Sequence, residues 1–94
     1  MINAKQCAVL CEVFKQPPSQ NLTYQLVLGL LTALGASPQP TKSGAIVVFS
    51  GGVVWSTHRP HPRPNMDKAA IVALRKALTV VGLTPAHVGC TCKP

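Results

Sequence analysis

The sequence predicts an α+β fold in which helices cover one face of an antiparallel sheet. The chain has 94 residues, of which 47% are hydrophobic and only 12% charged, and this composition suits one small domain with a single core. Two β-branched and aromatic runs follow each other in the middle of the chain, and segments with helical periodicity flank them. Strands that come consecutively between helices favour an α+β architecture.

The first segment has the spacing of an amphipathic helix. Its apolar side chains follow the i, i+3, i+4, i+7 pattern and are Cys7, Leu10, Cys11 and Phe14. Asn3 and Gln6 are placed to form a capping box at its start. Pro17 and Pro18 end the segment, because proline cannot continue a helix. Residues 1–18 are therefore predicted to form an N-terminal helical arm.

A second helix is predicted from about Asn21 or Leu22 to Leu34, where leucines recur every four residues. Gly35 follows at the position that favours a left-handed residue. The next segment, residues 36–40, contains two prolines, so it predicts at best a short edge strand.

A β-hairpin is the clearest local signal in the sequence. The runs 45–49 and 53–57 are rich in β-branched and aromatic residues, and Ser50-Gly51-Gly52 joins them. Two adjacent glycines permit the positive φ angles of a tight turn. The single tryptophan, Trp55, is expected to pack in the core or at the edge of the sheet.

The last helix is predicted to begin near Asn65 or Asp67, after a stiff proline-rich connection over residues 58–64. Its buried stripe is formed by Ile71, Leu74, Leu78 and Val81. Gly82 is expected to end it, with Leu83 packing back on the helix. Residues 84–94 show no periodicity and are expected to form a loose tail.

The charge balance points to an anionic partner. The chain carries a formal net charge of +7, and its only acids are Glu12 and Asp67. Clustered cations with few opposing acids favour nucleic-acid binding, because they can follow phosphates and release counterions. The plainer alternative is a set of solvated surface cations that keep the protein soluble. The candidate RNA-binding residues are Lys42, Arg59, Arg63, Lys68, Arg75 and Lys76.

Two histidines in the proline-rich connection, His58 and His61, are candidate catalytic residues. An imidazole can accept or donate a proton near neutral pH, so it could deprotonate the 2′-hydroxyl of RNA while nearby cations stabilise the phosphorane. The alternative is an imidazole that only caps the sheet or stacks on Trp55. No metal and no cofactor are expected, since an H-x-x-H pair without nearby carboxylates is not a metal site.

Cysteine usage and hydropathy favour a cytoplasmic protein. The longest apolar run, residues 26–34, is far below the ~20 residues of a membrane-spanning helix. The N-terminus does not have the pattern of a secretory signal. The C-x3-C and C-x-C pairs match no common zinc spacing, so ordinary reduced thiols are expected at Cys7, Cys11, Cys90 and Cys92.

Four stretches of the chain carry a family resemblance. They are L-L-T-A-L-G-A (30–36), S-G-A-I-V-V-F (43–49), H-R-P-H-P-R-P-N-M-D-K (58–68) and L-R-K-A-L-T-V-V-G-L (74–83). Together they resemble HicA-type toxins, the small mRNA-cleaving partners in HicAB toxin–antitoxin pairs. The resemblance implies a double-stranded-RNA-binding-domain-like fold over residues 19–83, with a three-stranded antiparallel sheet against two helices and the N-terminal helix as an addition.

The same resemblance implies metal-free mRNA cleavage, silenced by a HicB-like antitoxin. The family's catalytic histidine lies in a G-S-H-x-x-F motif, and this chain has Gly44 and Phe49 at the ends of that motif. Ala45 stands at the serine and Ile46 at the histidine, so the proton-transfer role would pass to His58 or His61. Three hypotheses follow: a HicA-like ribonuclease, a non-catalytic HicA-like protein that binds RNA or an antitoxin, and a basic protein-interaction module.

Overall fold

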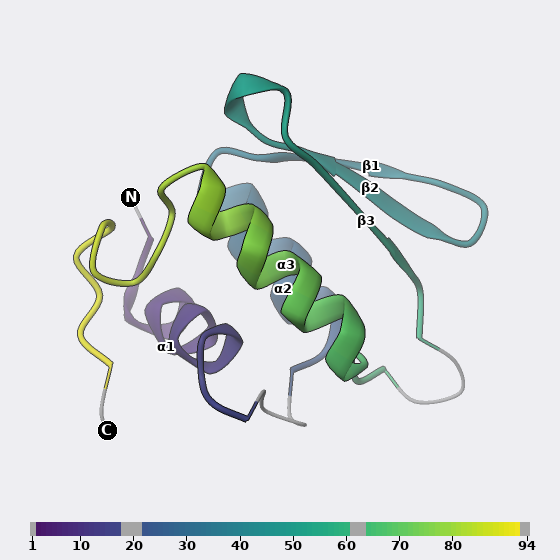
Figure 1. Cartoon of the computed structure of the whole chain (residues 1–94). Coiled ribbons are helices and arrows are strands. Elements are labelled where there is room, and N and C mark those ends of the chain that lie inside the picture. The colour runs from purple at the N-terminus through teal and green to yellow at the C-terminus, as the bar shows by residue number, and fades with distance from the viewer. Residues whose placement is uncertain (1, 18–21, 61–63, 93–94) are drawn as a thin grey trace.

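The computed structural model describes residues 2–17, 22–60 and 64–92, and it confirms the α+β class (Figure 1). A three-stranded antiparallel sheet of order β1-β2-β3 is covered on one face by α2 and α3, and α1 packs on these two helices. The elements are α1 (Ala4–Val13), α2 (Tyr24–Ala33), β1 (Ser37–Pro40), β2 (Gly44–Val48), the 3-10 turn η1 (Ser50–Gly52), β3 (Val54–His58) and α3 (Lys68–Val80).

Side-chain caps begin the three helices. The predicted capping box is confirmed: Asn3 Oδ1 accepts from the Gln6 N–H at 2.9 Å, and Gln6 Oε1 accepts from the Asn3 N–H at 3.0 Å. Thr23 caps α2, whose first residue is therefore later than the sequence predicts. Asp67 caps α3, as one of the two predicted candidates. In each case the cap satisfies an amide in the first turn, which has no partner within its helix.

Two glycines end α2 and α3 as predicted. Gly35 has φ 90° and Gly82 has φ 78°, a region that L side chains rarely adopt. After Gly82, the Leu83 N–H returns to the Leu78 carbonyl at 2.9 Å, which completes a Schellman-type end for α3. The positive φ angle of each glycine lets the chain turn from its helix into the next segment.

The sheet has the predicted hairpin and edge strand. β2 and β3 pair from Gly44↔His58 to Val48↔Val54, and β1 pairs with β2 along the other side. The two glycines of η1 have φ angles of 80° and 83°, as the tight turn requires. β1 is the short proline-containing edge strand expected from residues 36–40.

One core joins the sheet and all three helices. Its fully buried large side chains are Leu10, Val13, Val27, Leu30, Leu31, Val47, Ile71, Leu74 and Leu78. Trp55 is 4% exposed, and its Nε1–H donates to the Ala70 carbonyl at 3.2 Å, so it packs in the core and links β3 to α3. The N-terminal helical arm is thus part of the core through Leu10 and Val13.

The prediction of reduced thiols is wrong, because the four cysteines form two disulfides. Cys7 is bonded to Cys90 and Cys11 to Cys92, and the Cα atoms of each pair are 5.5 Å apart. Cys7 and Cys11 are one helical turn apart on α1, so the two bridges run side by side to the extended segment near the C-terminus. The described part of the expected loose tail, residues 84–92, is therefore cross-linked to α1.

In the described ranges, no helix combines the length and the apolar character that crossing a bilayer would need.

Candidate nucleic-acid interface

One end of the sheet gathers predicted site residues that are far apart in the sequence. The turn between β1 and β2 contains Lys42, and β3 ends at His58, which Arg59 follows. The Arg59 N–H donates to the Ser43 carbonyl at 2.6 Å, which holds the two segments side by side. Figure 1 shows this end of the sheet on the opposite side of the molecule from both chain termini. We call Lys42, Ser43, His58 and Arg59 the basic end.

Backbone packing fixes the geometry of the basic end. Thr41 closes the turn, since its N–H donates to the Gly44 carbonyl at 2.9 Å and its Oγ1 accepts from the Gly44 N–H at 3.0 Å. A Cβ at Gly44 would collide with the Thr57 carbonyl oxygen and lie 2.7 Å from the His58 Cα. Only glycine therefore allows this close approach of the two chains.

His58 lies on the outer face of the sheet. Side chains alternate along the strands, and Ala45, Val47 and Trp55 point toward the helices and are buried. Ile46, Val54 and His58 belong to the opposite, outward set and are exposed. Ile46 pairs with Ser56, so His58 is its diagonal neighbour on β3, at a distance of about 7–8 Å for such positions.

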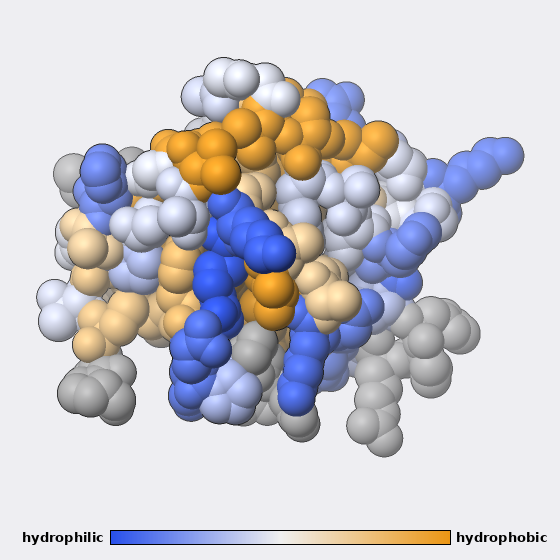
Figure 2. All heavy atoms as spheres, viewed as in Figure 1, coloured by the Kyte–Doolittle hydropathy of each residue, from blue (hydrophilic) through white to orange (hydrophobic). Residues whose placement is uncertain are grey.

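Exposed apolar side chains lie on the same outer face of the sheet as His58. The exposed large apolar residues of the sheet are Ile46, Val48 and Val54. Figure 2 shows hydrophobic side chains gathered over the sheet and hydrophilic side chains over the front of the helical layer. The outer face of the sheet thus differs in character from its basic end.

The cations of α3 are used in different ways. Lys68 in the first turn and Lys76 two turns later are exposed. Arg75, by contrast, donates from Nε and Nη2 to the Val13 carbonyl, both at 3.1 Å, and from Nη2 to the Lys15 carbonyl at 2.8 Å. It therefore satisfies the Val13 carbonyl in the last turn of α1, which lacks a partner within that helix, and the Lys15 carbonyl just after it.

Two predicted site residues, His61 and Arg63, lie outside the described residues. Over the ranges that are described, no three His, Cys, Asp or Glu side chains come together in a way that could hold a metal ion.

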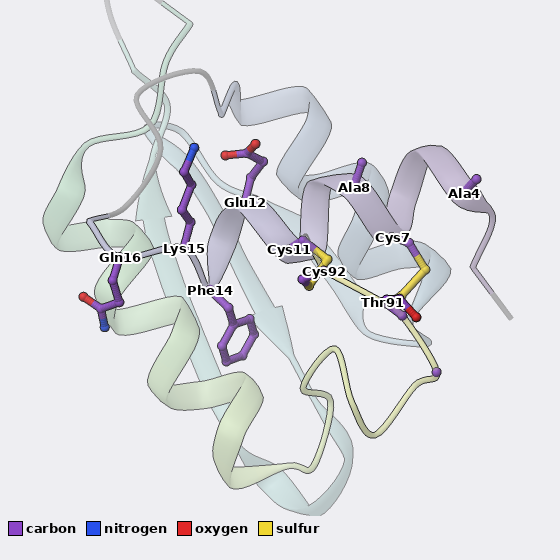
Figure 3. A pocket seen from close by; sticks show the side chains of 12 residues that line it. Ala4, Cys7, Ala8, Cys11, Glu12, Phe14, Lys15, Gln16, Thr91 and Cys92 are labelled. Atoms are coloured by element: carbon purple, nitrogen blue, oxygen red, sulfur yellow. A yellow bond between two sulfur atoms is a disulfide. The ribbon is translucent and has the colours of Figure 1, made fainter. Parts of the chain in front are cut away.

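A pocket opens at the end of the molecule that carries the disulfides (Figure 3). It lies between α1 and residues 89–92, with both disulfides in its lining. Glu12 and Lys15 belong to it, and Glu12 Oε2 is buried with no hydrogen-bond partner among the described residues. Sequence reasoning missed this pocket, because the bonded cysteines of its two walls are more than 80 residues apart in the sequence. The one local signal was the i, i+4 cysteine pair on a predicted helix.

Comparison with known proteins does not identify a family. No protein-family model matches the chain, and neither a curated protein nor a solved structure shows significant similarity to it. The α+β fold and the basic end are therefore established by the geometry of this chain alone.

Proposed function

We propose that this protein is a HicA-like toxin that binds RNA at the basic end and cleaves it without a metal. The observation that carries the proposal is the hydrogen bond from the Arg59 N–H to the Ser43 carbonyl, because it brings Lys42, His58 and Arg59 together from two segments. Two exposed cations on the segments next to an exposed imidazole would form a site for a phosphodiester. The partner implied by the resemblance is a HicB-like antitoxin.

The arrangement of elements supports an RNA ligand. From α2 through the sheet to α3, the order is helix, three antiparallel strands and helix, which is the layout that the resemblance implies. A double-stranded-RNA-binding-like domain uses separate surface segments to contact successive grooves and the phosphates between them. Here the β1–β2 turn presents Lys42 and the first turn of α3 presents Lys68, so cations stand on two such segments.

The exposure of His58 supports a role in proton transfer. It is exposed on the same outer face as Ile46, where the family resemblance implies a histidine. As a base, the imidazole would take the proton of the 2′-hydroxyl while the 2′-oxygen attacks the adjacent phosphorus. The bond from phosphorus to the 5′-oxygen would break to leave a 2′,3′-cyclic phosphate, the 5′-oxygen would take a proton from water, and Lys42 and Arg59 would stabilise the negative charge on the phosphorane.

The test is cleavage of a mixed-sequence RNA by the disulfide-bonded protein in EDTA. We expect the wild type to cleave it and His58→Gln to lose nearly all activity while keeping its affinity for RNA. His61→Ala is the parallel variant, and its loss of activity in place of that of His58→Gln would move the base to the second histidine. His87→Gln, at an exposed histidine near the C-terminus, is the matched control.

The remaining outcomes separate the other two hypotheses. Intact RNA together with salt-sensitive binding would identify a non-catalytic HicA-like protein, since contacts to phosphates weaken with salt. Absence of binding, or binding that does not respond to salt, would instead support a basic module that interacts with proteins.

A further inference from the structure

The two edges of the sheet are built differently. On β1, the Thr41 N–H points to β2, where it meets the Gly44 carbonyl. Backbone groups of successive residues alternate in direction, so Gln39 also faces β2 while Pro38 and Pro40 face away. Proline has no N–H group, so these two positions offer no donor to another strand. The β1 edge is therefore protected against further pairing.

The β3 edge has no such protection. Hydrogen bonds from Phe49 N–H to the Val53 carbonyl and from Arg59 N–H to the Ser43 carbonyl set the alternation on this side. They turn the amides of Val54, Ser56 and His58 away from β2. Among the described residues, no backbone hydrogen bond outside the strand ladders reaches these three amides. β3 thus presents a row of open donors, with no proline in the strand.

Four exposed residues of α3, which we call the α3 ledge, lie on the side of the helix nearest this open edge. The hydrogen bond from Trp55 to the Ala70 carbonyl places that side of α3 next to β3, and Arg75 fixes the opposite side against α1. By helical geometry, the exposed positions nearest β3 follow the i, i+4, i+7, i+11 spacing. They are Ala69, Ala73, Lys76 and Val80. Three of the four are apolar, so a strand beside β3 would find a low apolar surface and one cation.

We propose that the β3 edge accepts an extended segment of an acidic partner protein as a fourth strand. Main-chain hydrogen bonds to Val54, Ser56 and His58 would supply the pairing, as in other cases of strand addition. Charge complementarity selects the partner: Arg59 follows the strand, Lys76 is exposed on the neighbouring helix α3, and the whole chain carries +7. A second copy of this chain would bring like charges together, which opposes self-pairing.

Strand addition acts through backbone donors and needs no proton transfer, so binding at this edge can be measured apart from RNA cleavage even though His58 and Arg59 also belong to the basic end. Val54 is 56% exposed on the outer face, so alternate apolar side chains of the incoming strand would gain a neighbour there. The opposite side chains would lie over the α3 ledge, where carboxylates can reach Lys76. An alternating acidic and apolar strand therefore fits both sides.

The probe is a seven-residue peptide that alternates glutamate and valine and is blocked at both ends. Amide hydrogen exchange, measured by NMR, should slow at Val54, Ser56 and His58 when this peptide is added, while the amides of β1 stay unchanged. A peptide with lysine in place of glutamate should bind about tenfold more weakly or worse, because it loses the charge complementarity.

Two variants test whether the edge itself binds. Ser56→Pro removes one outward donor and copies the protection seen on β1, so it should abolish binding; Ser56→Ala is its side-chain control and should bind normally. If Ser56→Pro does not fold, Val54→Glu tests the same edge: it removes an apolar contact and adds a negative charge that repels the acidic strand, so it should weaken binding by about tenfold or more. Unchanged exchange at the three amides would overturn the proposal. So would a wild-type dimer that Ser56→Pro dissociates, because a second copy would then occupy the edge.

Discussion

The two ends of the molecule are stabilised by different means. At one end, two disulfides join α1 to residues 90 and 92, and the Arg75 guanidinium bonds to the last carbonyls of α1. At the basic end, backbone hydrogen bonds, the bond from the Gly44 N–H to the Thr41 hydroxyl and the close approach at Gly44 hold the segments together. Adjacent like charges cost stability. The cross-linked end can offset that cost, which leaves the basic end free to present cations.

The cross-linked end also bears on where the protein works. Disulfides persist mainly in oxidising compartments, and they are rare in the cytosol outside redox-sensing proteins and hyperthermophiles. The prediction of a cytoplasmic location was based in part on reduced thiols, and the two bridges remove that argument.

Replacing all four cysteines by alanine should have the largest effect on stability. The bridge from Cys7 to Cys90 spans a sequence separation of 83 residues, and closing a loop of that length is worth about 4–5 kcal/mol in the chain-entropy model. Removing only the bridge from Cys11 to Cys92 should cost about 2 kcal/mol, because the first bridge already closes the long loop. Guanidinium unfolding measures both values. Equal losses for one bridge and for two would contradict this account.

Gly44→Ala should disrupt the basic end. The new Cβ meets backbone atoms of Thr57 and His58, which cannot rotate away, so we expect a loss of about 3 kcal/mol and weaker RNA binding. Gly29→Ala is the matched control: it lies in α2 with nothing within 4 Å of its added Cβ, and it should stabilise the helix by about 1 kcal/mol. Thermal unfolding of the two variants and of the wild type measures both changes in stability. A Gly44→Ala variant as stable as the wild type would contradict the prediction.

Arg75→Gln and Lys76→Gln should separate the two roles of cations on α3. Arg75→Gln breaks hydrogen bonds to the Val13 and Lys15 carbonyls, so the free energy of unfolding should fall by about 1–3 kcal/mol with little change in RNA affinity. Lys76→Gln changes an exposed side chain, so it should weaken RNA binding and leave stability within about 0.5 kcal/mol. The reverse pattern would show that Arg75 acts on RNA.

The smallest expected effect is that of Asp67→Asn. Asparagine can also cap α3, so stability should stay within about 0.5 kcal/mol, whereas Asp67→Ala should lose about 1 kcal/mol with the bond to the Ala70 amide. Asp67 is one of the two acids of the chain and precedes Lys68 directly. Asp67→Asn should therefore strengthen RNA binding by about twofold, since it reduces repulsion of phosphates. Fluorescence anisotropy with a labelled RNA measures this change.

Features specified by neighbouring residues could be predicted from the sequence. The capping box at Asn3 and Gln6, the cap at Asp67 and the helix-ending glycines Gly35 and Gly82 each depend on residues a few positions apart. The hairpin depends in the same way on its glycine turn. Such local signals carry their own geometry.

Features that need distant segments to meet could not be predicted. The disulfide partners are more than 80 residues apart, and the C-x3-C and C-x-C spacings do not show which cysteines pair. Arg75 and Lys76 are adjacent cations that look equivalent in the sequence, and only the packing of α1 assigns Arg75 a structural role. The juxtaposition of Lys42 with Arg59 likewise appears only once the sheet register is known.

The most direct test of the central claim compares two double variants with the same net charge. Lys42→Gln with Arg59→Gln removes two cations from the basic end, and Lys5→Gln with Lys15→Gln removes two exposed cations near the cross-linked end. We measure how the RNA association constant falls with salt. The account predicts that the logarithmic slope decreases by about two for the first pair and stays unchanged for the second. Equal decreases for both pairs would contradict it, because RNA would then respond to total charge and not to the basic end.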